Sequence, residues 1–126
     1  MKKLLRGGFV VTPRGSRRAD VLLDGEKIAQ VGHISPAEAK GAEVTDVSGC
    51  YLFPGFIDAH THFDLDVCNT TTADDFASGT RSAIRGGTTM VIDFACPNKG
   101  ESLQYGLDLW HKKADGRSSC DYSFHM

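Results

Sequence analysis

From residue 53 onward the sequence alternates between strand-like and helix-like segments, and this rhythm limits the possible folds more than any other feature. Residues 88–94 are β-branched and apolar, as is typical of a strand buried on both faces. Residues 56–62 and 121–126 predict two further strands, one before and one after it. Strands separated by helical segments favour a parallel sheet with helices packed outside it, so we expect an α/β fold here.

The two intervening segments carry helix signals. Thr72 and Asp75 have the spacing of a capping box, which would put acidic residues in the first turn of a helix ending at Gly86-Gly87. A second helix is predicted from near Ser102 to Gly116. Its apolar stripe would consist of Leu103, Leu107, Trp110 and Ala114.

The first part of the chain, residues 1–52, has a different texture. Short alternating segments are separated by turn residues, and Asp24-Gly25 between two of them is a strong hairpin signal. We expect a small antiparallel sheet, with about one helical turn at residues 35–40. The sequence thus predicts two regions, residues 1–52 and residues 53–126.

Composition excludes several classes of protein. Of the 126 residues 40% are hydrophobic and 24% are charged, which is ordinary for a globular protein. The net charge of −2 does not indicate binding to nucleic acid or to an anionic membrane. No apolar run approaches the length of a membrane span or a signal peptide. The four cysteines are widely spaced, so free thiols and a cytoplasmic location are expected. Because the strand at 121–126 would form an uncovered apolar edge, we expect a larger parent chain.

His60-Thr61-His62 carries the chemistry of the sequence. In an extended strand the side chains at i and i+2 point to the same face, so the two imidazoles can bind one divalent metal ion. Asp58 lies on the same predicted face and one layer deeper. Its carboxylate would either orient a ligating histidine or be a buried structural group bonded to the backbone.

Four segments resemble the amidohydrolase superfamily, and in this order they are similar to its cyclic-amidase branch, the D-hydantoinases and dihydropyrimidinases. The His-x-His signature alone is shared by many members of the superfamily. The resemblance implies the start of a TIM-like (β/α)8 metal-dependent hydrolase barrel, β-α-β-α-β, preceded by a small β-sandwich segment. The segments are residues 52–62, 74–80, 86–94 and 121–125.

The resemblance also implies a chemistry. Family members hydrolyse the cyclic amide bond of dihydropyrimidines or 5-substituted hydantoins to N-carbamoyl amino acids, using a metal-activated hydroxide. His60 and His62 would bind one of two divalent ions, expected to be zinc, bridged by a carboxylated lysine that lies beyond this sequence. The acid/base aspartate is also expected downstream. We therefore expect a homotetrameric enzyme as the intact protein and an inactive fragment as the 126 residues alone.

Alternatives remain open at this stage. Phe63 and Leu65 follow the histidines and would either line an apolar substrate pocket or pack beneath the loop. The parent could be a non-catalytic dihydropyrimidinase-like scaffold protein, although such proteins depart from the His-x-His pair. It could also be another amidohydrolase, such as a dihydroorotase or an allantoinase.

Overall fold

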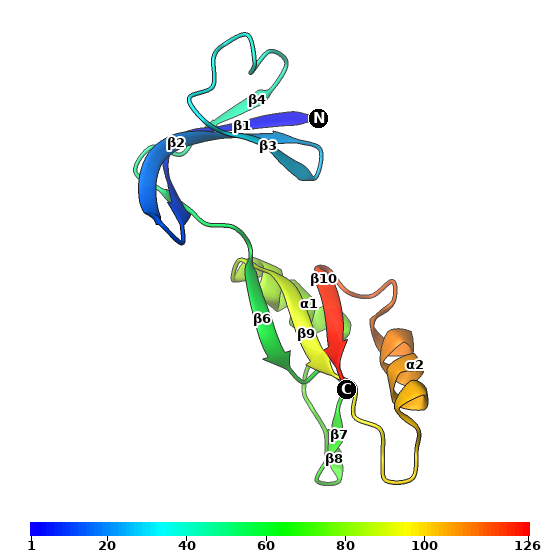
Figure 1. The fold of residues 1–126 in the computed structure, drawn as a ribbon. Coiled ribbons are helices and arrows are strands. Elements are labelled where there is room, and N and C mark those ends of the chain that lie inside the picture. Colours follow the sequence, from blue (N-terminus) through cyan, green and yellow to red (C-terminus); the bar gives the residue numbers. More distant parts are fainter. The chain divides into compact units, whose positions relative to one another are not determined.

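A computed structural model describes all 126 residues (Figure 1). The contacts between residues divide the chain into two compact units, Met1–Pro54 and Gly55–Met126. The first unit contains only strands and turns, and the second contains strands and both helices of the chain.

The first unit is a mixed sheet. Strands β1, β2 and β3 pair antiparallel, as predicted, but β4 and β5 both pair parallel to β1. The expectation of a purely antiparallel sheet was therefore wrong. Residues 33–42 form a connection that carries the chain from β3 to the opposite edge of β1, and a strand arriving that way need not run antiparallel. The strands are β1 Lys2–Thr12, β2 Gly15–Asp24, β3 Lys27–Gly32, β4 Glu43–Asp46 and β5 Tyr51–Leu52.

Local signals in this unit were informative. Gly25 adopts a φ of 60° in the turn between β2 and β3, which confirms the Asp24-Gly25 hairpin. The amide of Ala39 donates to the carbonyl of Ser35 at 3.0 Å, so one helical turn forms where it was expected. The buried core of the unit consists of Leu4, Leu22 and Ile34.

The second unit follows the predicted alternation of strands and helices. Its sheet has the order β10-β9-β6 and is parallel throughout (Figure 1). A small antiparallel hairpin, β7–β8, was not predicted and interrupts the loop after β6. The elements are β6 Phe56–Thr61, β7 Asp66–Val67, β8 Thr70–Thr71, α1 Phe76–Arg85, β9 Thr88–Phe94, α2 Leu103–Ala114 and β10 Asp121–His125.

Helix α1 begins later than predicted. Its N-cap is Asp75, whose carboxylate accepts a hydrogen bond from the Ser78 amide at 2.8 Å while the Ser78 hydroxyl accepts from the Asp75 amide at 3.2 Å. The capping box is thus Asp75–Ser78, and no acidic residue lies in the first turn. Thr72 does not cap the helix because its hydroxyl accepts a hydrogen bond from the Leu65 amide at 3.0 Å.

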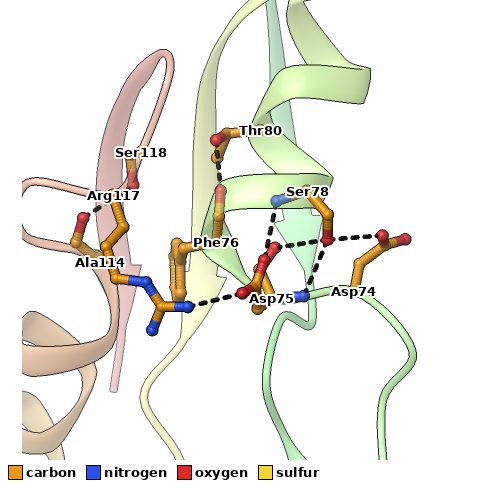
Figure 2. A network of polar contacts seen from close by, with 8 residues as sticks. All are labelled: Asp74, Asp75, Phe76, Ser78, Thr80, Ala114, Arg117 and Ser118. Carbon is orange, nitrogen blue, oxygen red and sulfur yellow. Dashed lines mark hydrogen bonds and ion pairs between the residues drawn. The ribbon is translucent and has the colours of Figure 1, made fainter.

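Polar contacts tie the start of α1 to the segment after α2 (Figure 2). The guanidinium of Arg117 contacts the Asp75 carboxylate at 2.6 Å. Inside the unit, the hydroxyl of Thr80 donates to the carbonyl of Phe76 and accepts from the Ser119 amide at 2.9 Å. Helix α1 and the chain leading into β10 are therefore held together by one exposed ion pair and one buried hydroxyl.

Helix α2 begins where it was predicted to begin, and its N-cap is Ser102, whose hydroxyl accepts from the Tyr105 amide at 3.1 Å. Its buried residues include Trp110 and Ala114, but Leu103 is 64% exposed and does not belong to the stripe. The helix is capped at Asp115, one residue before the predicted Gly116.

The core of the second unit gathers residues of both helices on one side of the sheet. Phe76, Ala95, Trp110 and Ala114 form it. Within β9 only Val91 and Asp93 are buried, so the expectation of a strand buried on both faces was wrong for this chain. Alternation along β9 and β10 turns Phe94 and His125 to the opposite face, which no helix covers.

Candidate metal centre

His60 and His62 converge at the carboxyl end of β6. Their Nε2 atoms lie 3.2 Å apart, with the ring planes at 85° to each other. Both side chains are exposed. Two imidazoles in this arrangement can share a proton in a direct hydrogen bond, or direct both Nε2 lone pairs at one ion.

The strand that carries the histidines is irregular. Its pairing with β9 shifts register between Asp58 and Thr61, where β6 has one residue more than its partner. Simple alternation therefore does not explain the convergence of the rings.

Neighbouring side chains support the arrangement. The ring of Phe94 lies 4.5 Å from that of His60 and 5.2 Å from that of His62, centroid to centroid. On its other side, Phe94 contacts His125 with centroids 4.7 Å apart. The Nε2 of His125 lies 3.0 Å from the carbonyl oxygen of Ala59. Because a carbonyl can only accept, this nitrogen carries the proton and His125 steadies the peptide that leads into His60.

Asp58 is exposed, so the expectation of a buried carboxylate was wrong for this chain. Strand β6 is an edge of the sheet. The carboxylate accepts a hydrogen bond from the His60 amide at 3.2 Å, which is the backbone contact that the sequence had left as an alternative.

Phe63 and Leu65 both pack against the core cluster of the second unit. The ring of Phe63 lies 5.4 Å from that of Phe76, centroid to centroid. It also covers Gly79 so closely that a Cβ there would lie 2.2 Å from the ring. These contacts favour the packing interpretation of Phe63 over a pocket role.

Sequence reasoning missed Asp93. The side chain is fully buried at 0% exposure, and its two carboxylate oxygens accept four hydrogen bonds. Two of the donors, the Thr61 hydroxyl and the Phe63 amide, flank His62 in the chain. A single acidic residue in an otherwise apolar strand was the signal that could have found it.

The donor pair suits a zinc-like ion. Two nitrogens bound at about 2.05 Å in a tetrahedral site lie roughly 3.3 Å from each other. The observed separation of 3.2 Å fits that arrangement. In residues 1–126 no group of three or more His, Cys, Asp or Glu side chains could hold a metal ion, so the histidine pair would supply two ligands and not a complete site.

The cysteines take no part in the histidine pair. All four are free thiols, as predicted. Burial is the main cause that raises the pKa of the Cys96 thiol, with the charge of Asp93 adding to it, and burial likewise raises that of Cys120. Neither environment favours the thiolate that would ligate a metal. Neither helix is long and apolar enough to cross a membrane.

Comparison with known proteins shows which class of protein this arrangement resembles. Residues 51–105, which include both histidines, match the model of the Amidohydrolase family. The D-hydantoinase of Geobacillus stearothermophilus is 48% identical over 100% of this chain and 26% of its own length. The chain is therefore similar to members of the amidohydrolase family.

Further similarities narrow the branch. The dihydropyrimidinase of Rattus norvegicus is 40% identical over 98% of this chain and 24% of its own length. The crystal structure of dihydropyrimidinase from Brevibacillus agri NCHU1002 superposes with a TM-score of 0.92 at 49% identity, covering 99% of this chain and 27% of that one. The chain is thus similar to D-hydantoinases and dihydropyrimidinases, and it spans about a quarter of their length.

Proposed function

We propose that the protein carrying this chain is a metal-dependent cyclic amidohydrolase. It opens the ring of dihydropyrimidines or 5-substituted hydantoins and releases N-carbamoyl amino acids. The observation that carries the proposal is the pair of imidazole nitrogens 3.2 Å apart at the end of a parallel strand. Similarity to hydantoinases and dihydropyrimidinases over the whole chain supports the choice of substrate class.

The proposal assigns an architecture to the two regions. Residues 1–52 would be the amino-terminal part of a small β-sandwich domain, and residues 53–126 the first strands and helices of a (β/α)8 barrel. In such barrels active sites lie at the carboxyl ends of the strands. The position of His60 and His62 at the end of β6, in a parallel sheet with helices on one side, is consistent with that arrangement.

In the reaction, His60 and His62 would hold one of two divalent ions, for which zinc is the proposed metal. The bound metal would supply an activated hydroxide and polarise the amide carbonyl. The two histidines act as neutral ligands, so their part is to bind and orient the ion. Asp58 fixes the backbone amide of His60. The bridging carboxylated lysine and the acid/base aspartate would come from outside these residues.

Other parts of the proposal concern the whole protein. A homotetramer, a cytoplasmic location and contact of Phe63 or Leu65 with the substrate remain predictions. Inactivity of the 126 residues alone also remains a prediction, and it follows from the incomplete ligand set.

The test uses the intact protein and its His60→Ala and His62→Ala variants. We expect each variant to lose bound metal, measured by inductively coupled plasma mass spectrometry, and to lose ring opening of dihydrouracil and hydantoin. His33→Ala is the matched control, because that histidine lies in the first unit and should leave both measurements unchanged. Full metal content and full turnover in the His60 and His62 variants would refute the ligand assignment.

The same assays separate the alternatives. Intact protein that binds metal but opens none of dihydrouracil, hydantoin, dihydroorotate or allantoin would support the scaffold alternative. Preference for dihydroorotate or allantoin would keep the metal centre and replace the substrate.

A further inference from the structure

We propose that Asp93 is a positioning residue for metal binding, which holds His60-Thr61-His62 in its ligating shape from the strand next to it. The inference rests on the proposed function, because it concerns the same histidine pair. Asp93 does not touch the imidazoles. It accepts hydrogen bonds from the hydroxyl of Thr61, which lies between the two histidines, and from the backbone amide of Phe63, which follows them.

The hydrogen bonds of Asp93 divide into two pairs. Oδ2 accepts from the Thr61 hydroxyl at 2.9 Å and from the Phe63 amide at 2.9 Å, so it is hydrogen-bonded to the residues on both sides of His62. Oδ1 accepts from the Phe94 amide at 2.9 Å and from the Trp110 indole at 2.8 Å. One oxygen thus faces the histidine segment, and the other is anchored to β9 and α2.

The anchoring end is rigid. Trp110 is 2% exposed and belongs to the core cluster together with Phe76 and Ala114. A side chain packed in that way holds its indole N–H in a fixed place, where it supports the Asp93 carboxylate together with the Phe94 amide.

The histidine segment lies at an irregularity in the backbone pairing of β6 with β9. The pairing of β6 with β9 slips between Asp58 and Thr61, so His60 is in an irregular stretch of the strand. Thr61 is paired directly with Asp93 at the point where the register resumes. The carboxylate supplies two extra bonds there, and these fix the direction in which the flanking histidines point.

Only a carboxylate satisfies this site. Four N–H or O–H donors converge on one buried side chain, and an ionised carboxylate has two oxygens that accept about four bonds between them. An asparagine would turn an NH₂ group toward two of those donors. Asp93→Asn therefore leaves one pair of donors unsatisfied, either on the anchoring side or on the histidine side.

The experiment separates positioning from general stability, using the intact protein. Thr61→Val removes the hydroxyl that reaches Oδ2 and keeps the shape of the side chain, whereas Thr61→Ser keeps the hydroxyl. Trp110→Phe removes one of the two donors at Oδ1, leaves the Phe94 amide to hold that oxygen, and keeps both bonds on the histidine side. For each variant, zinc affinity of the metal-free protein is measured by competition with a chelator, and thermal stability by calorimetry.

We expect Thr61→Val and Asp93→Asn to weaken zinc binding roughly 10- to 100-fold, the range seen when groups that orient metal ligands are removed. Thr61→Ser should restore affinity close to that of the unmodified protein. Trp110→Phe should lower thermal stability while zinc affinity changes by less than about threefold, well below that range.

Two results overturn different statements. If Thr61→Val lowers thermal stability but binds zinc as tightly as Thr61→Ser does, Asp93 is a structural residue and this inference is wrong. If His60→Ala and His62→Ala retain their metal, the ligand assignment in the proposed function is wrong. Since Thr61 is not a metal ligand in either case, the two failures can be told apart.

Discussion

Replacing Gly79 with alanine tests the close packing between α1 and the residue that follows His62. In a helix interior, alanine is more favourable than glycine by about 1 kcal/mol, which by itself would stabilise the protein. At Gly79, however, a Cβ would lie 2.2, 2.6 and 2.8 Å from three atoms of the Phe63 ring. Overpacking a core costs about 1–3 kcal/mol.

The net effect follows from which of these contributions is larger. Phe63 cannot simply swing away, because its ring is packed edge-on against the fully buried Phe76. We therefore place the overpacking near the upper end of its range, which leaves Gly79→Ala destabilised by about 1–2 kcal/mol. Hydrogen exchange of the α1 and β9 amides in the intact protein measures this as a change in the free energy of opening.

A second variant serves as the control. Phe63→Leu removes the ring, so adding Gly79→Ala to that background should be neutral or should stabilise α1 by up to about 1 kcal/mol. An increase in stability from Gly79→Ala in the unmodified background would refute the reasoning, because it would mean that the Phe63 ring yields without loss.

Two further predictions concern the polar contacts of α1. Thr80→Val should destabilise the second unit by about 1–3 kcal/mol, since it leaves the Ser119 amide without its buried acceptor. Thr80→Ser keeps the hydroxyl and should destabilise the unit less. Equal losses of stability for the two variants in urea denaturation would contradict this. The Ser78 amide, with smaller contributions from the Ser78 hydroxyl and Arg117, holds the pKa of Asp75 below its ordinary value of 3.8. The charged cap therefore stabilises the helix above pH 3.8, and this is lost as the pH falls through the lower folded pKa. Asp75→Asn should remove that acid sensitivity from the exchange of α1 amides, and an unchanged pH profile would argue against it.

The elements that sequence predicts well are those fixed by neighbours in the chain. Helical spacing located both helices, and α2 begins directly after Ser102, close to the predicted start. At the start of α1 both Thr72 and Asp75 are residue types that can cap a helix, and the structure uses Asp75. The sequence could not show that the Thr72 hydroxyl would instead accept a hydrogen bond from the Leu65 amide. The parallel pairing of β4 and β5 with β1 was missed because it depends on which edge of the sheet the chain returns to.

The same distinction applies to the candidate site. The His60–His62 pair is visible in three consecutive residues, so both candidate ligands could be named from the sequence. The support supplied by Asp93 could not, because its partners Thr61 and Trp110 are 32 and 17 residues away in the sequence. Local chemistry identifies the ligands, whereas the folded structure is needed to identify what holds them.

The hairpin β7–β8 lies just beyond the histidines and closes largely on itself (Figure 1). Its two tip residues, Cys68 and Asn69, both have positive φ angles of 51° and 60°, as a tight two-residue hairpin requires. The backbone amide of Thr72 donates to Leu65 at 2.9 Å and closes the base. Substitutions at the tip, including glycine at Cys68 to relieve the left-handed backbone, should therefore leave the positions of the His60 and His62 imidazoles unchanged. Variation among related sequences should accumulate at that tip and be scarce at Thr61, Asp93 and Trp110.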